Sequence, residues 1–185
     1  MTELERIGEK NREDYCRRYA DLEAEYQLAD WLDSIGYFTA PAACKHHGAY
    51  AGGLYAHSKE VAEKLIELTL MGACETWQDE LSPIKVGLLH DVCKTQDYIL
   101  KILSPGNTEI RYVQQDKLWR GHGEASAIML RHIWITEEEM ACIRYHMGAF
   151  TDQDEWKHYT TAVKKYQNVL WTHAADMYAS QVLGI

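Results

Sequence analysis

Apolar residues recur at helical spacing along this chain, and several of the helical segments also place a histidine or an aspartate on the apolar face. The clearest case is VGLLHDVCK, residues 86–94, where His90 and Asp91 end an apolar run that includes Val86 and Leu89. His90 lies four residues after Val86, so the two side chains share one face of a helix. A chain patterned in this way must fold into helices that bury polar side chains together with the core.

Length and composition are those of an ordinary globular chain. The 185 residues favour one domain with a sizeable core, and hydrophobic residues make up 46%. A formal net charge of −9 disfavours nucleic acid and anionic membranes as partners. No apolar run is long enough for a membrane span and the charged start lacks a signal-peptide pattern, so we expect a cytoplasmic protein. The five cysteines lack C-x-x-C spacing, which predicts reduced core cysteines rather than disulfides or a zinc ribbon.

The apolar periodicity predicts an all-α fold, a helical bundle with a short β-hairpin near residues 98–113. The turn signal SPGN between two β-prone runs indicates the hairpin. Ser82 and Pro83 suit an N-cap and a first helical position, and Thr136 with Glu139 makes a capping box. We expect helices over residues 28–35, 54–70, from 82 onward, 121–133, 136–147 and 158–182, and no domain boundary within residues 1–185.

Five of these helices aim a histidine or an aspartate at a common interior. A single histidine on an apolar face is more often a hydrogen-bonded core residue than a ligand. That explanation is weaker when five helices each carry such a residue, because burying isolated charges costs several kcal/mol unless something compensates them. A divalent cation compensates imidazoles and carboxylates together, which predicts a shared metal site. The residues concerned are His57, His90, Asp91, His122, His146 and Asp176.

The order of these residues resembles that of the HD-domain superfamily of metal-dependent phosphohydrolases. Its pattern is a histidine, an adjacent His-Asp pair and a later aspartate, all on different helices. His57, His90, Asp91 and Asp176 match that pattern in this chain. The resemblance implies a single HD domain, with an N-terminal helical extension over about residues 1–40 and a metal-binding core over about 46–180.

The segments HHGAYAGGLYAH and GHGEAS are similar to segments of HD proteins related to a bacterial 3′–5′ exoribonuclease. The chain also resembles small bacterial and phage-like HD proteins, which share the segments GHGE and HMG. In two-metal members, intervening histidines hold a second ion; His122 and His146 match them, and Asp91 would bridge the ions. The chain departs from the pattern at Met147, where a second histidine is usual, and at Cys93, where glycine is common. The resemblance implies one or two divalent ions of iron, manganese, nickel or zinc, with magnesium as an alternative.

The resemblance also implies roles in hydrolysis for other polar residues. Asp91, Lys94 and Glu124 are the catalytic candidates: Lys94 would neutralise charge on phosphoryl oxygens, and Glu124 would transfer a proton or orient a ligand. Lys94 matches the lysine of HD-x-x-K forms, although a surface lysine at a helix end is an equal alternative. Phosphate contacts are expected from Lys45, His46, His47, Arg120 and Arg144, with solvated polar positions as the alternative.

We therefore expect a metal-dependent phosphohydrolase that cleaves a phosphate ester of a nucleotide or another small molecule. The alternatives are a 3′–5′ nuclease or cyclic-nucleotide phosphodiesterase, a non-catalytic metal- or nucleotide-binding sensor, and a di-iron oxygenase. The acidic balance favours the small substrate, and a basic groove leading to the metals would favour the nuclease. No membrane partner is expected, nucleic acid is a less favoured one, and a homo-oligomer stays open.

Overall fold

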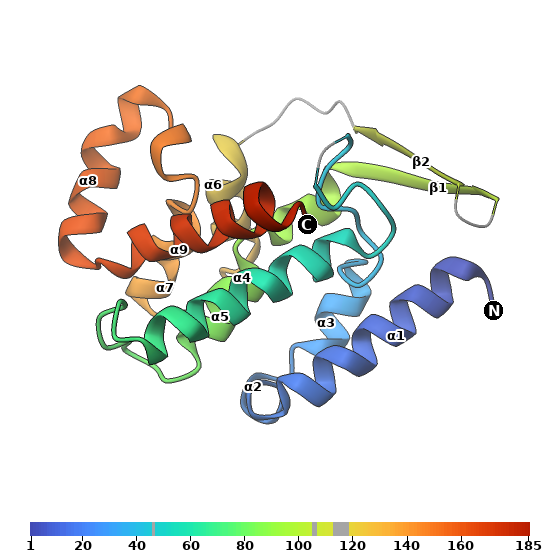
Figure 1. Ribbon diagram of the computed structural model, residues 1–185, viewed down its shortest axis with the longest axis horizontal. Coiled ribbons are helices and arrows are strands. Elements are labelled where there is room, and N and C mark those ends of the chain that lie inside the picture. The colour runs from blue at the N-terminus through green and yellow to red at the C-terminus, as the bar shows by residue number, and fades with distance from the viewer. Residues whose placement is uncertain (46, 105–106, 113–118) are drawn as a thin grey trace.

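The computed structural model describes residues 1–45, 47–104, 107–112 and 119–185. Over these residues the chain is mostly helical, with one small antiparallel sheet (Figure 1). Among the described residues, no helix is both long and apolar enough to cross a membrane. The expectation of a mostly helical bundle with a short hairpin is confirmed.

The N-terminal segment is helical and covers one side of the molecule (Figure 1). Its elements are α1 (Glu3–Arg18), α2 (Ala20–Tyr26) and α3 (Ala29–Ser34). The expected stop after α3 is present, because Gly36 adopts a φ of +76°, which glycine reaches without strain.

The centre of the bundle is formed by α4 (Gly53–Leu70) and α5 (Ser82–Leu89), which lie side by side. Gly87 allows their close approach, since a Cβ at this position would lie 2.4 Å from the Cα of Ala62 on α4. The buried hydroxyl of Tyr37 donates to the carbonyl of Leu88 at 2.6 Å and holds the end of α5 from the other side. The segment that follows, Val92–Gln96, is a 3₁₀ turn.

The hairpin lies at one end of the bundle (Figure 1). Strand β1 (Tyr98–Ser104) pairs antiparallel with β2 (Asn107–Tyr112), and Tyr98 stands opposite Tyr112. Its bounds agree with the expected hairpin near residues 98–113, although the turn positions 105 and 106 lie outside the described residues.

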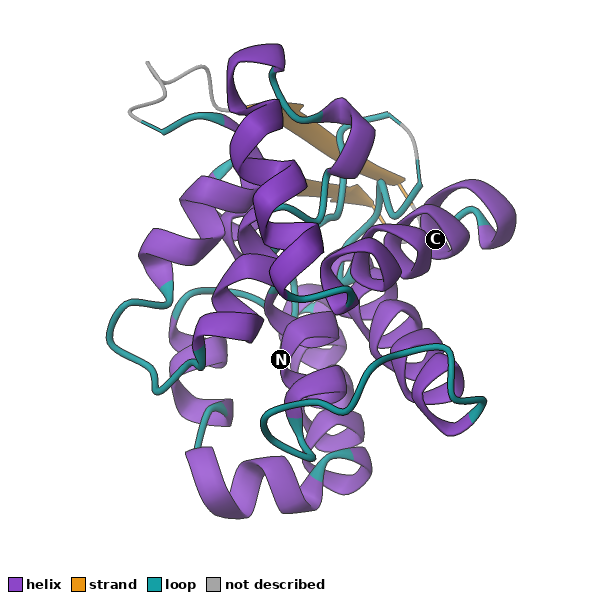
Figure 2. Ribbon diagram, turned by 90° about the vertical axis from the view of Figure 1, so that its left-hand side faces the viewer, coloured by secondary structure: helices purple, strands orange, loops and turns teal. Residues whose placement is uncertain are grey.

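The C-terminal helices complete the bundle on the side opposite α1–α3. Figure 2, seen from the α8 side, shows helices over most of the molecule. α9 packs against both α4 and α7, and α7 packs against α5, so these four helices surround one interior. The elements are α6 (Gly121–Met129), α7 (Glu137–Arg144), α8 (Trp156–Lys165), α9 (Asn168–Met177), a π-helical turn over Tyr178–Leu183, and 3₁₀ turns over Gly148–Phe150 and Gln153–Glu155.

The apolar core lies between these central helices and the N-terminal side. Burial of large aliphatic side chains supplies the main driving force for folding. The fully buried ones include Leu22, Leu32, Leu54, Leu65, Leu88, Leu89, Leu130, Ile143 and Val169.

The single last helix expected over residues 158–182 is wrong. The backbone of Tyr166 is extended, with φ −137° and ψ 95°, and this divides the segment into α8 and α9. The cause is a long-range anchor at Asn168, the first residue of α9. Its side chain accepts the Glu75 N–H at 2.9 Å and donates to Glu138 at 2.9 Å, which holds this point of the chain in the core.

Two other helices end before the expected positions 133 and 147. α6 ends at Met129, and α7 ends at Arg144. After α7 the chain turns at Gly148, whose φ is +53°. A Cβ at Gly148 would lie 2.4 Å from the ring of His173, so this turn packs directly on α9 and requires glycine.

The helix start signals have different outcomes. The capping box of Thr136 and Glu139 is confirmed, with both reciprocal hydrogen bonds formed. The N-cap expected at Ser82 is wrong, because Leu81 precedes the first turn and Ser82 already belongs to α5. The Ser82 hydroxyl instead donates to the carboxylate of Glu139 at 2.7 Å. This carboxylate is buried, so it needs hydrogen-bond donors from the protein.

Candidate metal centre

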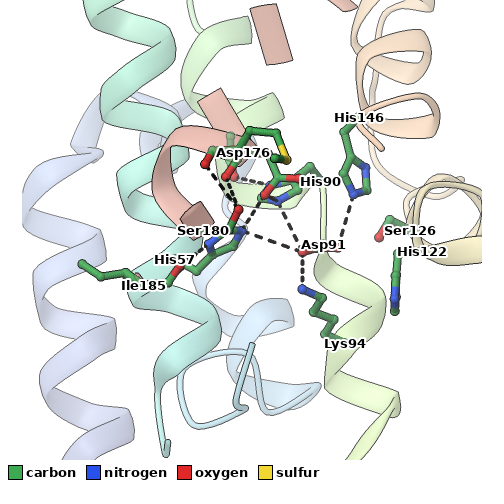
Figure 3. A network of polar contacts seen from close by, with 12 residues as sticks. His57, His90, Asp91, Lys94, His122, Ser126, His146, Asp176, Ser180 and Ile185 are labelled. Atoms are coloured by element: carbon green, nitrogen blue, oxygen red, sulfur yellow. Dashed lines mark hydrogen bonds and ion pairs between the residues drawn. The ribbon is translucent and has the colours of Figure 1, made fainter. Parts of the chain in front are cut away.

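Five of the residues predicted to bind metal meet in the interior between α4, α5, α7 and α9 (Figure 3). His57 comes from the second turn of α4, His90 and Asp91 follow α5, His146 follows α7, and Asp176 lies near the end of α9. The three histidines are fully buried, and Asp91 is 2% exposed. Elements far apart in the sequence therefore bring their polar side chains to one point.

Asp91 occupies the middle of this cluster (Figure 3). Its Oδ2 lies 3.4 Å from Nε2 of His90 and 3.9 Å from Nε2 of His57. Its Oδ1 lies 3.5 Å from Nε2 of His146 on the other side. Nε2 of His57 also lies 3.1 Å from Oδ1 of Asp176. The nitrogen that faces the cluster is Nε2 in all three rings.

Backbone carbonyls determine the tautomer of these three histidines. Nδ1 of His57, His90 and His146 contacts a carbonyl oxygen at 2.8, 2.8 and 2.7 Å, respectively. A carbonyl oxygen only accepts, so Nδ1 must carry the proton and donate it. In a neutral imidazole, Nε2 is then a bare lone pair. A ring oriented through its other nitrogen is typical of histidines that ligate metals. The carbonyl oxygens belong to Ile185, Gly87 and Ile143.

Within the part of the chain that the structure describes, the inward-facing atoms have no hydrogen-bond partner. Nε2 of His57, His90 and His146 and Oδ1 of Asp91 are all buried and unpaired. Although Nε2 of His57 is 3.1 Å from Asp176, the two atoms form no hydrogen bond, because one lone pair faces another. Each buried polar atom without a partner costs about 1–3 kcal/mol. Four acceptor atoms that face one another in this way are complementary to a cation.

Three overlapping groups of donors within the described residues could hold a metal ion. In each group the donor atoms lie within 4.8 Å of one another. Imidazole nitrogens and carboxylate oxygens suit divalent transition metals such as iron, manganese, nickel and zinc. The donor set therefore fits such an ion, and Asp91 belongs to two of the groups. The groups are His57, His90 and Asp176; His90, Asp91 and His146; and Asp91, Cys93 and His122.

Lys94 is the ammonium nearest to the cluster. Its Nζ lies 2.6 Å from Oδ2 of Asp91, and the residue is 7% exposed. Burial alone would raise the pKa of Asp91, but the ammonium of Lys94 and the adjacent imidazole of His90 outweigh it and hold that pKa well below the ordinary value. Lys94 compensates one oxygen of Asp91 and leaves the other unpaired. It is therefore not the surface lysine that the sequence offered as an alternative.

The pKa values of two of the histidines move in opposite directions. Burial lowers the pKa of His90, which favours the neutral ring that a metal requires. For His146, burial also opposes the charge, but contact with the Asp91 carboxylate outweighs it and raises the pKa. The Asp91 carboxylate thus favours positive charge at His146, whether from a proton or from a metal.

His122 lies next to the cluster but in a different donor group from His146. Its Nδ1 is 3.3 Å from Oδ2 of Asp97 and 3.7 Å from Sγ of Cys93. The structure thus brings Cys93 to the site, a residue that the sequence treated only as a departure from glycine. Burial raises the pKa of this thiol to about 12. The signal that could have identified it was its place two residues after Asp91.

A cavity of about 350 Å³ opens beside the cluster. Lys94 is the one lysine or arginine among the described residues that line it, so these residues form no basic groove leading to the cluster. Of the predicted phosphate contacts, His47 lines the cavity and its ring centre is 5.5 Å from that of His57. Lys45 is exposed outside the lining, and His46 lies outside the described residues. The lining also includes Asp91, His122, Met147, Phe150, His173, Asp176 and Met177.

The structure does not bring Arg120, Arg144 and Glu124 to this cavity. Arg144 pairs with Glu124 at 3.2 Å and with Glu155 at 2.9 Å. Arg120 pairs with Asp154, and its backbone N–H donates to Glu124. These side chains form ion pairs with one another near the surface, outside the described lining of the cavity.

None of three comparisons, made with models of protein families, with curated proteins and with solved structures, finds a match for this chain. The resemblance to HD phosphohydrolases therefore rests on the residues themselves. What the geometry adds is that five of the six residues predicted to bind metal converge, and that the sixth, His122, joins them through Asp91 and Cys93.

Proposed function

We propose that this protein is a metal-dependent phosphohydrolase of the HD type that acts on a small phosphate ester, with nucleotides as the first class to test. His57, His90, Asp91 and Asp176 would hold a divalent transition metal, and His146 would add a further nitrogen donor beside it. One observation carries the proposal: four buried, unpaired donor atoms converge beside a cavity of about 350 Å³.

When bound, a divalent transition metal supplies Lewis acidity toward water and toward a phosphoryl oxygen. The chain's own residues would bind the cation and keep the donor atoms oriented toward it. The carbonyls that accept from Nδ1 keep the three Nε2 lone pairs aimed at the carboxylate of Asp91, so no reorientation is needed when a cation enters. The surrounding apolar helices exclude water, which strengthens electrostatic interactions inside the site.

Lys94 has a second role in this proposal. Its ammonium pairs with Asp91 in the absence of a cation and also lines the cavity. Once a cation compensates Asp91, the same ammonium is available to hold the negative charge of a phosphoryl group. His47 also lines the cavity, and burial lowers its pKa, so it is suited to hydrogen bonding as a neutral ring.

The size and charge of the cavity support a small substrate over a nucleic-acid strand. A volume of about 350 Å³ lies near the lower end of the range for small-molecule sites. A nucleic-acid strand would need a groove lined by several lysine or arginine side chains to bind its successive phosphates. Lys94 is the one lysine or arginine in the described lining, and it pairs with Asp91.

The test combines metal content with a substrate panel. We expect the gently purified protein to contain divalent transition metal by mass spectrometry, and to release phosphate from nucleotides with manganese, iron or nickel added. Asp91→Ala should lose most of the metal and the activity, because Asp91 belongs to two of the donor groups. His158→Ala is the matched control, since this histidine is exposed on α8.

The outcomes separate the alternative functions. A wild-type protein that neither contains nor rebinds these metals would rule out the proposal. Metal binding without turnover on any phosphate ester would favour a sensor, and cleavage of oligonucleotides in preference to mononucleotides would favour a nuclease. A mixed-valent iron pair detected by electron paramagnetic resonance would instead favour an oxygenase.

A further inference from the structure

Cys93 lies in the interior at the boundary between two elements. It belongs to the 3₁₀ turn after Asp91 and is 4% exposed. Its backbone N–H donates to the buried hydroxyl of Ser126 on α6 at 3.3 Å, so it is held against α6. Its thiol donates weakly to the carbonyl of His122 at 3.4 Å. These contacts position the sulfur beside the imidazole of His122.

The distance between the two side chains matches that of two ligands on one metal ion. Sγ of Cys93 lies 3.7 Å from Nδ1 of His122. With Zn–S of about 2.3 Å and Zn–N of about 2.05 Å, tetrahedral ligands lie about 3.6 Å apart. Together with an oxygen of Asp91, these donors lie within 4.8 Å of one another.

A second observation shows that the position is suited to a cation. The carboxylate of Asp91 is nine-tenths or more buried, and its Oδ1 has no hydrogen-bond partner. The carboxylate of Asp97 lies 3.3 Å from the same Nδ1 of His122, so a second acidic side chain stands beside this position. An ordinary buried cysteine would account for neither the unpaired oxygen nor the acidic residue beside the imidazole.

We propose that Cys93 is a ligand of a second cation position, which it shares with His122 and Asp91, and that its sulfur selects zinc or iron(II) there over manganese and magnesium. The inference rests on the metal centre proposed above and adds the identity of a ligand and of the metal class. On binding, the thiol proton leaves to solvent, and the sulfur donates a lone pair to the cation without a change in its oxidation state. Thiolate ligands favour softer metals, whereas magnesium and manganese favour oxygen.

The position is connected to the first cation position through Asp91. His57, His90 and Asp176 form one donor group, and Asp91, Cys93 and His122 form another. His122 is partly exposed and lines the cavity, so the second position faces any substrate bound there. A thiolate lowers the net charge of a site by one unit relative to a neutral ligand, which distinguishes this position from one built on histidines alone.

The experiment is a cobalt(II) and zinc titration of the full-length protein after removal of metal by a chelator. In the wild type, the second equivalent of cobalt should produce a sulfur-to-cobalt charge-transfer band in the near ultraviolet. Cys93→Ser should lose the band and bind the second equivalent of zinc at least about ten-fold more weakly. Even a residue that only hydrogen-bonds to a metal ligand changes metal affinity by about that factor. Binding of manganese should change little.

Cys142→Ser is the matched control, because Cys142 is as buried as Cys93 but belongs to none of the donor groups. It should keep the band and the zinc affinity. If Cys93→Ser fails to fold, Cys93→Gly replaces it, and a thiol-reactivity assay on the wild type provides a further measurement. One thiol should become protected when the second equivalent of zinc binds.

Each result either supports or overturns the inference. A wild type that binds a first equivalent and hydrolyses phosphate esters, but shows no cobalt–sulfur band and no thiol protection, overturns the role of Cys93 and leaves the proposed function intact. A wild type that binds no metal at all overturns both. The band in wild type and Cys142→Ser, with its loss in Cys93→Ser, supports the inference.

Discussion

Two clusters of buried polar side chains lie in the same bundle, and they differ in one respect. The first, the paired cluster, is built around Lys85 and Glu139, both fully buried. The second, the metal-centre cluster, is built around Asp91 and its three histidines. Both bury charge that would be costly if isolated. They differ in whether their polar atoms have partners.

The paired cluster satisfies its atoms from within the chain. Nζ of Lys85 lies 3.0 Å from Glu139 and 3.2 Å from Asp79. Glu139 also accepts from the hydroxyl of Ser82 and from the backbone N–H of Thr136. The ammonium of Lys85 lies over the ring of Tyr26 at 4.0 Å, a cation–π contact. None of these side-chain atoms is buried without a partner.

The metal-centre cluster leaves four buried atoms unpaired at its centre. At about 1–3 kcal/mol each, they cost an amount comparable to the total stability of a small protein. Burial of charge therefore does not by itself identify a functional site, since both clusters have it. What distinguishes the metal-centre cluster is that the described residues supply no hydrogen-bond partner for four of its atoms.

The largest expected effect comes from breaking the paired cluster. Glu139→Ala leaves the buried ammonium of Lys85 with Asp79 as its remaining carboxylate. Removal of one partner from a buried ion pair costs about 3–5 kcal/mol of stability. We expect a loss of about 3 kcal/mol in the free energy of unfolding, because Asp79 still pairs with Lys85. Urea denaturation of the metal-free protein measures the loss.

Glu137→Ala is the control from the same helical turn. Its side chain is 71% exposed and pairs with Lys165 at 2.6 Å. Solvent screens an exposed pair, so its loss should change the free energy of unfolding far less than the loss of the buried pair. Equal losses in the two variants would contradict the distinction between the buried pair and the exposed one.

The next effect concerns the partner that the metal-centre cluster lacks. Zinc at about one hundred times its dissociation constant should stabilise the wild type by about 2.7 kcal/mol, because it binds the folded state and supplies the missing contacts. In the metal-free protein, His146→Leu should change stability by about 1 kcal/mol at most, since the atom that it removes is unpaired. Thermal unfolding with and without zinc measures both.

Asp91→Ala and His158→Ala are the controls for this measurement. Asp91→Ala should show no stabilisation by zinc, and His158→Ala should be stabilised as much as the wild type. If His146→Leu destabilised the metal-free protein as much as Glu139→Ala does, the two clusters would not differ as we describe.

The smallest expected effect is on pH dependence. Burial opposes the charge on His146, but Asp91 outweighs it and raises the pKa. In the metal-free protein, His146 thus contributes stability below its unfolded pKa of about 6.5, and this is lost as pH rises through the higher folded pKa. Metal binding requires the unprotonated ring, so stabilisation by zinc should increase over the same pH range.

Thermal unfolding at about pH 6 and about pH 8, on either side of this range, measures the two opposite trends. His146→Leu should flatten both. A wild type whose stabilisation by zinc decreases toward higher pH would contradict the assignment of Nε2 as a ligand.

The elements that could be predicted from the sequence depend on local contacts. The helix over Gly53–Leu70 follows from apolar spacing, and the capping box of Thr136 and Glu139 involves residues three positions apart. The hairpin near 98–113 follows from its turn signal. In each case the residues that determine the structure are neighbours in the chain.

The elements that could not be predicted depend on distant contacts. The break at Tyr166 follows from the hydrogen bonds of Asn168 with Glu75 and Glu138, and no periodicity in the last segment indicates it. Glu124 and Arg144 were plausible at the site by their sequence positions. The ion pair that they form with each other was decided by the packing of α6 against α7.

The sequence by itself determined that histidines and aspartates lie on the apolar faces of several helices, because helical periodicity is local and can be counted along the chain. Only the tertiary structure decided which of their atoms lack a partner. It paired Glu139 with Lys85, left Nε2 of His57, His90 and His146 facing Asp91, and brought Cys93 beside His122. The physical reason is that a hydrogen bond or an ion pair depends on distances between atoms of different helices, which are established only when the helices pack.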